Sequence, residues 1–191
     1  LPSLAPLIED NPDLQVDLTV AELHQLPEVL ASGRADFVLV NDPIRKESVE
    51  NHLLGHERNV LVRRSRGFAR DAVFIDHDER DSTTIDFFQE QGRSLPKDYR
   101  RSFLDDIETI MAGVENGLGR AVIPLHLLRE RKALEPVSGF KIQKVPVHLS
   151  HFTQPFYTEL QKAVLEILKT GVAKALAPSH AVPRLVLDWR E

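Results

Sequence analysis

The chain has 191 residues, a hydrophobic content of 42% and a formal net charge of −5. This length fits one domain or two small lobes with a core, and the negative charge leaves no basic footprint for nucleic acid. The absence of cysteine excludes disulfide scaffolds and thiolate chemistry. No apolar run is long enough to span a bilayer, and the first eight residues lack the basic start and cleavage site of a signal peptide.

The first third of the chain predicts alternating helices and strands. Apolar residues at helical spacing predict a first helix around residues 4–8. Residues 14–20 alternate between apolar and polar side chains, as a half-exposed strand does. A second helix over 24–32 ends at Gly33, and a buried strand over 37–40 follows it. A strand, a short helix and a strand in this order predict a right-handed parallel crossover.

The middle of the chain predicts a strand followed by a capped helix. The strand covers residues 73–75, and the helix begins near Asp81, Ser82 and Thr83 and ends at Gly92. These residues serve as a plain helix cap. With the free amides of the first turn, their hydroxyls also make an anion-binding site. Both interpretations stay open at this point.

The stretch from Asp105 to Pro124 has the most definite pattern in the chain. Asp105 or Asp106 caps a helix, Gly117 stops that helix in the left-handed conformation, and a short buried strand follows and ends at the proline. Gly117 and Gly119 do not form a dinucleotide fingerprint, because that motif needs a strand before the glycines and a helix after them. We therefore predict a helix, a glycine turn and a strand.

The last third predicts a short helix, a strand, a long helix and a tail. The short helix lies around residues 127–134, the alternating strand covers 141–151, and the amphipathic helix covers 155–168. The tail alternates over residues 185–189 and contains the single tryptophan. We expect this tail to form a strand against a sheet edge or a partner chain, because exposed large apolar residues are a liability.

Two patterns suggest metal chemistry. Asp76 and Asp78 follow a strand, as do the nucleophile and the acid of haloacid-dehalogenase-like phosphatases, so a Mg-dependent phosphatase is one alternative function. His148 and His151 would form a metal-binding pair only on a helix, because strand residues three apart point to opposite faces. We predict neither a metal site nor a cofactor.

Two stretches of the chain resemble the effector-binding domain of LysR-type transcriptional regulators. The first has L-P-x-L at its start and G-x-x-D after its second helix, and the second has V-x-x-G-x-G before an apolar strand that ends in proline. The residues that match are Leu1, Pro2, Leu4, Pro12, Leu30, Gly33, Asp36, Val114, Gly117, Gly119, Ala121, Ile123 and Pro124. The family order of elements covers about residues 1–170. We expect the family's first strand and its DNA-binding winged helix-turn-helix to lie outside this chain.

The resemblance implies an α/β fold with two lobes and a hinge, like that of type 2 periplasmic binding proteins. Lobe I would take residues 1–62 and 145–191, and lobe II would take residues 63–144. It also implies a cytoplasmic ligand sensor that is not an enzyme and that pairs as a homodimer or higher homo-oligomer. DNA would be contacted only through the upstream domain. A periplasmic solute-binding protein remains a second alternative.

The resemblance and the helix start together predict an effector site between the lobes. The effector would be a small anion, a carboxylate, held by Ser82 and Thr83 at the start of a helix. The resemblance adds the loop that holds Asn41 and the turn formed by Ile123 and Pro124. No membrane is expected to take part.

Overall fold

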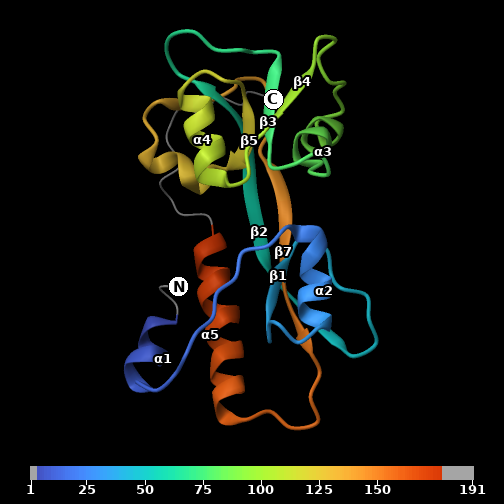
Figure 1. The fold of residues 1–191 in the computed structure, drawn as a ribbon, viewed down its shortest axis with the longest axis vertical. Helices are drawn as coiled ribbons and strands as arrows, with labels where there is room; N and C mark the ends of the chain where they lie inside the picture. Colours follow the sequence, from blue (N-terminus) through green and yellow to red (C-terminus); the bar gives the residue numbers. More distant parts are fainter. Residues whose placement is uncertain (1–3, 178–191) are drawn as a thin grey trace. The chain divides into compact units, whose positions relative to one another are not determined.

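The computed structural model describes residues 4–177, which form two compact units (Figure 1). Unit 1 comprises residues 4–57 and 145–177, and unit 2 comprises residues 58–144. The expected boundary after residue 62 falls after residue 57 instead. The boundary lies inside a strand, because β2 (Val49–Arg64) contributes its first half to unit 1 and its second half to unit 2.

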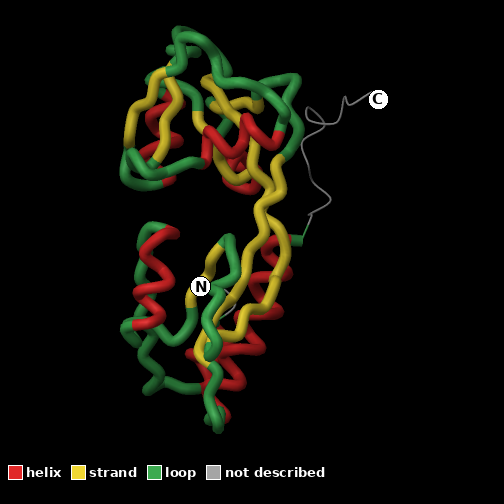
Figure 2. Tube along the Cα trace, turned by 90° about the vertical axis from the view of Figure 1, so that its right-hand side faces the viewer, coloured by secondary structure: helices red, strands yellow, loops and turns green. Residues whose placement is uncertain are grey.

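Unit 1 is a small sheet with four helical segments. Its strands are ordered β1-β7-β2, and β1 pairs antiparallel with β7, with Val38 opposite Ser150. Figures 1 and 2 show β2 and β7 running side by side. The bounds of the elements are α1 (Ala5–Asp10), η1 (Leu23–Gln25), α2 (Leu26–Ala31), β1 (Val38–Val40), β7 (Gln143–Phe152) and α5 (Glu159–Leu176). A cluster of valine and leucine side chains from α2 and β1 forms the core.

Two expectations for unit 1 are wrong. Residues 14–20 form no strand, and the side chains of Leu18 and Val20 are 65% and 93% exposed. A strand needs a neighbouring strand to satisfy its backbone groups, and the described residues supply none for this segment. The parallel crossover is consequently absent, and β1 instead pairs antiparallel with a strand from the other end of the sequence.

Unit 2 has a parallel core, built around β3. This strand pairs in parallel with β4, and on its other side its backbone bonds to Arg120, at the start of β5. Strands β5 and β6 pair antiparallel with the second half of β2. The bounds of the elements are β3 (Val73–Asp76), α3 (Thr83–Glu90), β4 (Arg100–Phe103), α4 (Ile107–Glu115), β5 (Ala121–Pro124), η2 (Leu125–Glu130) and β6 (Leu134–Pro136). Two apolar clusters form the core of this unit.

The predicted order of helix, glycine turn and strand over residues 105–124 is confirmed. Asp106 is the N-cap of α4, and its carboxylate accepts the amide of Thr109 at 2.9 Å. Gly117 has a φ of 78°, in the left-handed region. Strand β5 then ends at Pro124.

Other predicted helices begin or end at different residues in the structure. The predicted helix over 127–134 is a 3₁₀ helix, η2, and Leu134 belongs to strand β6. Helix α5 begins later than residue 155 because Thr158 and Gln161 form a capping box there, and it continues to Leu176. The predicted tail strand over 185–189 lies outside the described residues. No helix within residues 4–177 combines the length and the apolarity that crossing a bilayer requires.

Candidate effector site

The carboxyl ends of the parallel strands in unit 2 meet at one edge of the sheet. Strands β3, β4 and β5 run in the same direction, so the loops that follow them leave from this edge (Figure 1). Helices α3 and α4 both begin there, after β3 and β4. Ligands of open α/β sheets bind outside such carboxyl ends. We define this edge, with the loop over residues 77–82 and the first turns of α3 and α4, as the carboxyl edge.

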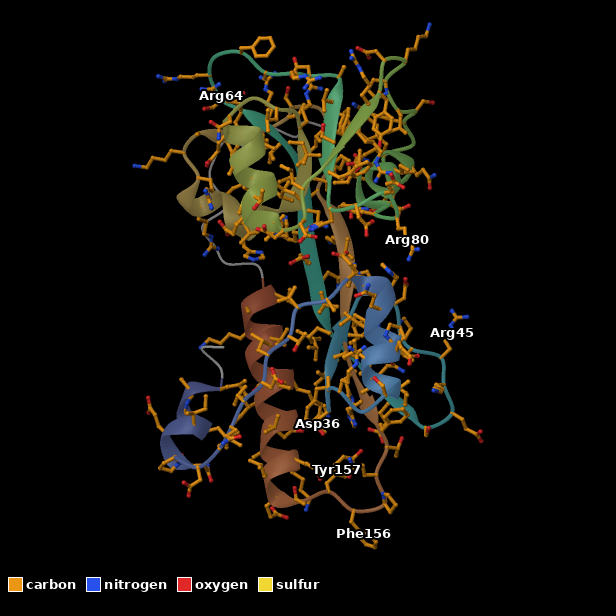
Figure 3. The ribbon with its side chains drawn as sticks, viewed as in Figure 1. Asp36, Arg45, Arg64, Arg80, Phe156 and Tyr157 are labelled. Atoms are coloured by element: carbon orange, nitrogen blue, oxygen red, sulfur yellow. The ribbon has the colours of Figure 1, made fainter. Side chains whose placement is uncertain are left out.

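Arg101 holds the loop over residues 77–82 in place; Arg80 marks this loop in Figure 3. The Nε of Arg101 donates to the Oδ2 of Asp76 at 2.7 Å. The rest of its guanidinium donates to the carbonyls of Asp78 and Glu79, both at 3.1 Å, and to the carbonyl of Asp81. Arg101 has no local signal in the sequence, since its partners lie 20 to 25 positions earlier in the chain.

Asp76 and Asp78 both form hydrogen bonds within the protein. The phosphatase alternative gives no reason for these contacts. Asp76 is buried, and its Oδ1 accepts the Thr84 hydroxyl at 2.5 Å. Burial raises the pKa of Asp76, against the hydrogen bonds from Thr84 and Arg101, which lower it. The carboxylate of Asp78 accepts the backbone amides of Arg80 at 2.6 Å and Asp81 at 2.8 Å. These contacts make both aspartates part of the loop's framework.

Helix α3 begins where the sequence predicted, with Ser82 as its N-cap residue. The carboxylate of Asp81 accepts the amide of Thr83 and the amide of His77, both at 2.9 Å. Burial alone would raise the pKa of Asp81, but hydrogen bonds from the Thr83 hydroxyl and from these two amides hold it below its usual value. The Ser82 hydroxyl donates to Asp86 at 2.5 Å. An ionised side chain of the protein thus occupies part of this helix start.

Two amides in the first turn of α3 are unpaired among the described residues, one on the fully buried Thr84 and one on the partly exposed Ile85. The first intrahelical bond at this end runs from the amide of Asp86 to the carbonyl of Ser82. The amides of Thr84 and Ile85, which precede Asp86, have no hydrogen-bond partner among residues 4–177. Such orphan donors at the positive end of a helix are suited to an oxygen with negative charge.

The loops after β3 and β4 are joined at the carboxyl edge. The Nδ1 of His77 donates to the carbonyl of Asp105 at 3.2 Å. The next residue, Asp106, caps α4 and accepts both the amide and the hydroxyl of Thr109. The start of α4 is therefore occupied in part by the carboxylate of Asp106, as the start of α3 is by that of Asp81.

The other predicted site residues have different environments. Ile123 is fully buried in the core and pairs with Val60 of β2, so only its backbone could face a ligand. Pro124 is half-buried at the end of β5. Asn41 lies in unit 1, directly after β1, and its carbonyl accepts the Nδ1 of His148 at 3.0 Å. Ser82 and Thr83 are adjacent at the start of α3.

Comparison with solved structures gives the same fold in proteins of low sequence identity. ArgP from Mycobacterium tuberculosis has a TM-score of 0.74 and 15% identity, over 91% of this chain and 63% of that one. The CcmR regulatory domain from Synechocystis PCC6803, in complex with 2-PG, has a TM-score of 0.70 and 17% identity, over 89% of each chain. LysG from Corynebacterium glutamicum, with the bound effector Arg, has a TM-score of 0.67 and 12% identity, over 92% and 63%.

The chain therefore spans less than two thirds of the length of ArgP and of LysG. The comparison with curated proteins gave no match. The family model of the LysR substrate binding domain matches residues 1–173, which is nearly the whole chain. The fold, the order of the elements and this match agree with the resemblance that the sequence motifs indicated. The chain belongs to the family of LysR substrate-binding domains.

Proposed function

We propose that this chain is the effector-sensing part of a cytoplasmic LysR-type transcriptional regulator, without catalytic activity. A small anionic effector, a carboxylate, binds at the carboxyl edge of unit 2 and biases the domain between two arrangements. A winged helix-turn-helix elsewhere in the protein converts this change into DNA binding, and the domain pairs as a homodimer. Family membership supports the sensing role, and the 2-PG and Arg bound by CcmR and LysG support a small-molecule effector.

The observation that carries the proposal is the pair of open amides in the first turn of α3. The amides of Thr84 and Ile85 have no partner among the described residues, at the positive end of a helix dipole. The hydroxyl of Thr83, the preceding residue, bonds to the carboxylate of Asp81. A carboxylate bound here would accept the amide of the partly exposed Ile85 directly, and that of the buried Thr84 only after a local shift of the chain.

The acidic residues of the loop limit the negative charge that the effector can carry. Asp81 is held ionised by its hydrogen bonds, and a second negative charge nearby is repelled unless it is closely paired with donors. Arg101, whose guanidinium donates to Asp76 and to three loop carbonyls, supplies the compensating positive charge. We therefore expect the effector to carry one compact carboxylate.

The experiment is a melting-temperature screen of small carboxylates, followed by titration of each hit. Thr83→Val keeps the shape of the side chain but removes the hydroxyl and its support of Asp81. We expect it to weaken binding by roughly 0.5–3 kcal/mol, the range for one hydrogen bond. Thr170→Val is the matched control, because its hydroxyl donates only to carbonyls within α5 of unit 1.

Two results would contradict the proposal in different ways. A hit that binds wild type and Thr83→Val equally well would move the site away from α3. A screen in which neutral or cationic compounds raise the melting temperature and carboxylates do not would refute the anionic class. Asn41→Ala, tested against the same hit, decides separately whether the loop after β1 contributes to binding.

A further inference from the structure

Three side chains that bind metals in other proteins meet in unit 1, away from the carboxyl edge. Glu50 and His52 stand two positions apart on β2, and His151 stands on β7, the neighbouring strand. Alternation along a strand puts residues two apart on one face. Asn51, which stands between them in the sequence, lies on the opposite face, where its Oδ1 accepts the Ser150 hydroxyl at 2.6 Å. The three side chains therefore share one face of the sheet.

Their ligand atoms have the spacing of a tetrahedral metal site. The two Nε2 atoms of His52 and His151 lie 3.1 Å apart. The Oε2 of Glu50 lies 3.5 Å from the Nε2 of His52 and 3.7 Å from that of His151. A Zn²⁺ ion about 2.1 Å from each ligand at tetrahedral angles separates the ligands by about 3.4 Å. All three distances lie within a few tenths of an ångström of that value.

The hydrogen bonding of His151 suits a ligand role. Its Nδ1 donates to the carbonyl of Phe152 at 3.0 Å, which leaves the lone pair on Nε2 when the ring is neutral. This outer hydrogen bond is the usual way in which proteins orient a metal-binding imidazole.

The three side chains differ in their exposure to solvent, with Glu50 and His52 on the open side and His151 on the closed side. The side chains of Glu50 and His52 are 45% and 29% exposed, whereas His151 is 2% exposed. The rings of Phe37 and Tyr157 lie 5.6 Å and 6.0 Å from the His151 ring; Tyr157 is labelled in Figure 3. An ion could therefore enter past Glu50 and keep a water molecule as its fourth ligand.

We propose that Glu50, His52 and His151 bind one divalent transition-metal ion of the Zn²⁺ type, which cross-links β2 to β7. Two imidazole nitrogens and one carboxylate favour such an ion over Mg²⁺ or Ca²⁺, which prefer oxygen ligands alone. The site is independent of the proposed effector, since all three residues belong to unit 1. Its binding energy would stabilise the folded state, because the ligands come together only on folding.

The test is Zn²⁺ binding to the chain without any added histidine tag, measured by competition with a chromophoric chelator. Wild type should bind one equivalent. His52→Gln and Glu50→Gln should each weaken binding by at least about tenfold, the lower range for losing even an outer-shell group. His56→Gln is the matched control, an exposed histidine on the same strand, and should bind as wild type does.

Two further measurements separate metal binding from a simple hydrogen bond between the two imidazoles. Zn²⁺ should raise the melting temperature of wild type and of His56→Gln, but not that of His52→Gln. Co²⁺ should give the absorption spectrum of a tetrahedral complex with wild type only when both His52 and His151 are present. No equimolar binding by wild type, or equal binding by all variants, would overturn the proposal in favour of a hydrogen-bonded histidine pair.

Discussion

Gly119 lies where β5 begins to run alongside β3, and the closeness of the two backbones requires a glycine there. A Cβ at this position would lie 2.6 Å from the carbonyl of Val73. Glycine is required at position 117 for a different reason. Gly117 ends α4 at a φ of 78°, and a Cβ there would collide with the carbonyl of Phe68. The two glycines thus serve a helix end and a strand contact, and neither is needed for a phosphate.

Gly119→Ala should destabilise unit 2. The added methyl group must push β5 away from β3, and overpacking of this kind costs about 1–3 kcal/mol. Urea unfolding followed by circular dichroism measures the change. Gly92→Asn is the control, because a Cβ at Gly92 meets no atom within 4 Å and asparagine tolerates its left-handed conformation. Equal stability of Gly119→Ala and wild type would show that the two strands are not so closely joined.

The start of α3 is an element whose stability depends on one carboxylate. Asp81 accepts the amides of Thr83 and His77, and its pKa lies below the usual value because these bonds and the Thr83 hydroxyl outweigh burial. A lowered pKa means that the ionised form stabilises the folded state above the unfolded pKa, about pH 4. This stabilisation is lost as the pH falls through the folded pKa. Burial raises the pKa of Asp76, so ionisation of that carboxyl group favours the unfolded state instead.

Asp81→Ala should cost about 1.5–3 kcal/mol at pH 7, the range for hydrogen bonds to a charged group, because the amides of Thr83 and His77 lose their acceptor. The difference from wild type should shrink below about pH 4, because protonation removes the same interaction from wild type. Urea unfolding at a series of pH values tests this. Asp98→Ala, which removes an exposed carboxylate in the same unit, is the control at each pH. A gap that stays constant down to pH 3 would mean that the charge of Asp81 is not involved.

At the scale of the whole molecule, unit 1 exposes a run of apolar side chains. Val16, Leu18, Val20 and Leu23 are all exposed, in the segment that follows α1. Large exposed apolar patches mark interaction sites. The family resemblance implied a homodimer, so a second copy of the chain is the partner that we expect to cover these residues.

Sedimentation should show a dimer at tens of micromolar chain, on the order of weak-interface affinities. The double variant Leu18→Asp and Val20→Asp should shift the chain toward monomer, because two charges would then be buried without partners. Phe68→Asp, in unit 2, is an equally exposed apolar position and should leave the dimer unchanged. Wild type that sediments only as monomer would contradict the proposed pairing.

Elements whose stabilising contacts lie within a few residues are encoded in local patterns of the chain. Asp106 caps α4 through Thr109, three positions later, and Gly117 ends the same helix, so both could be predicted from short patterns. The start of α3 also has a local hydrogen bond, from the amide of Thr83 to the carboxylate of Asp81 two positions earlier. Family motifs built from these local features also identified the fold class, which the family match then confirmed.

Features that join distant parts of the chain depend on the three-dimensional fold. Residues 14–20 alternate as a strand does, yet a strand forms only where another strand can pair with it. Arg101 reaches Asp76 from 25 positions away, and His151 meets His52 from 99 positions away. Alternation correctly separated His148 from His151, but it could not supply the partner that β2 brings. Such contacts depend on which strands become neighbours, and no local pattern in the sequence encodes that choice.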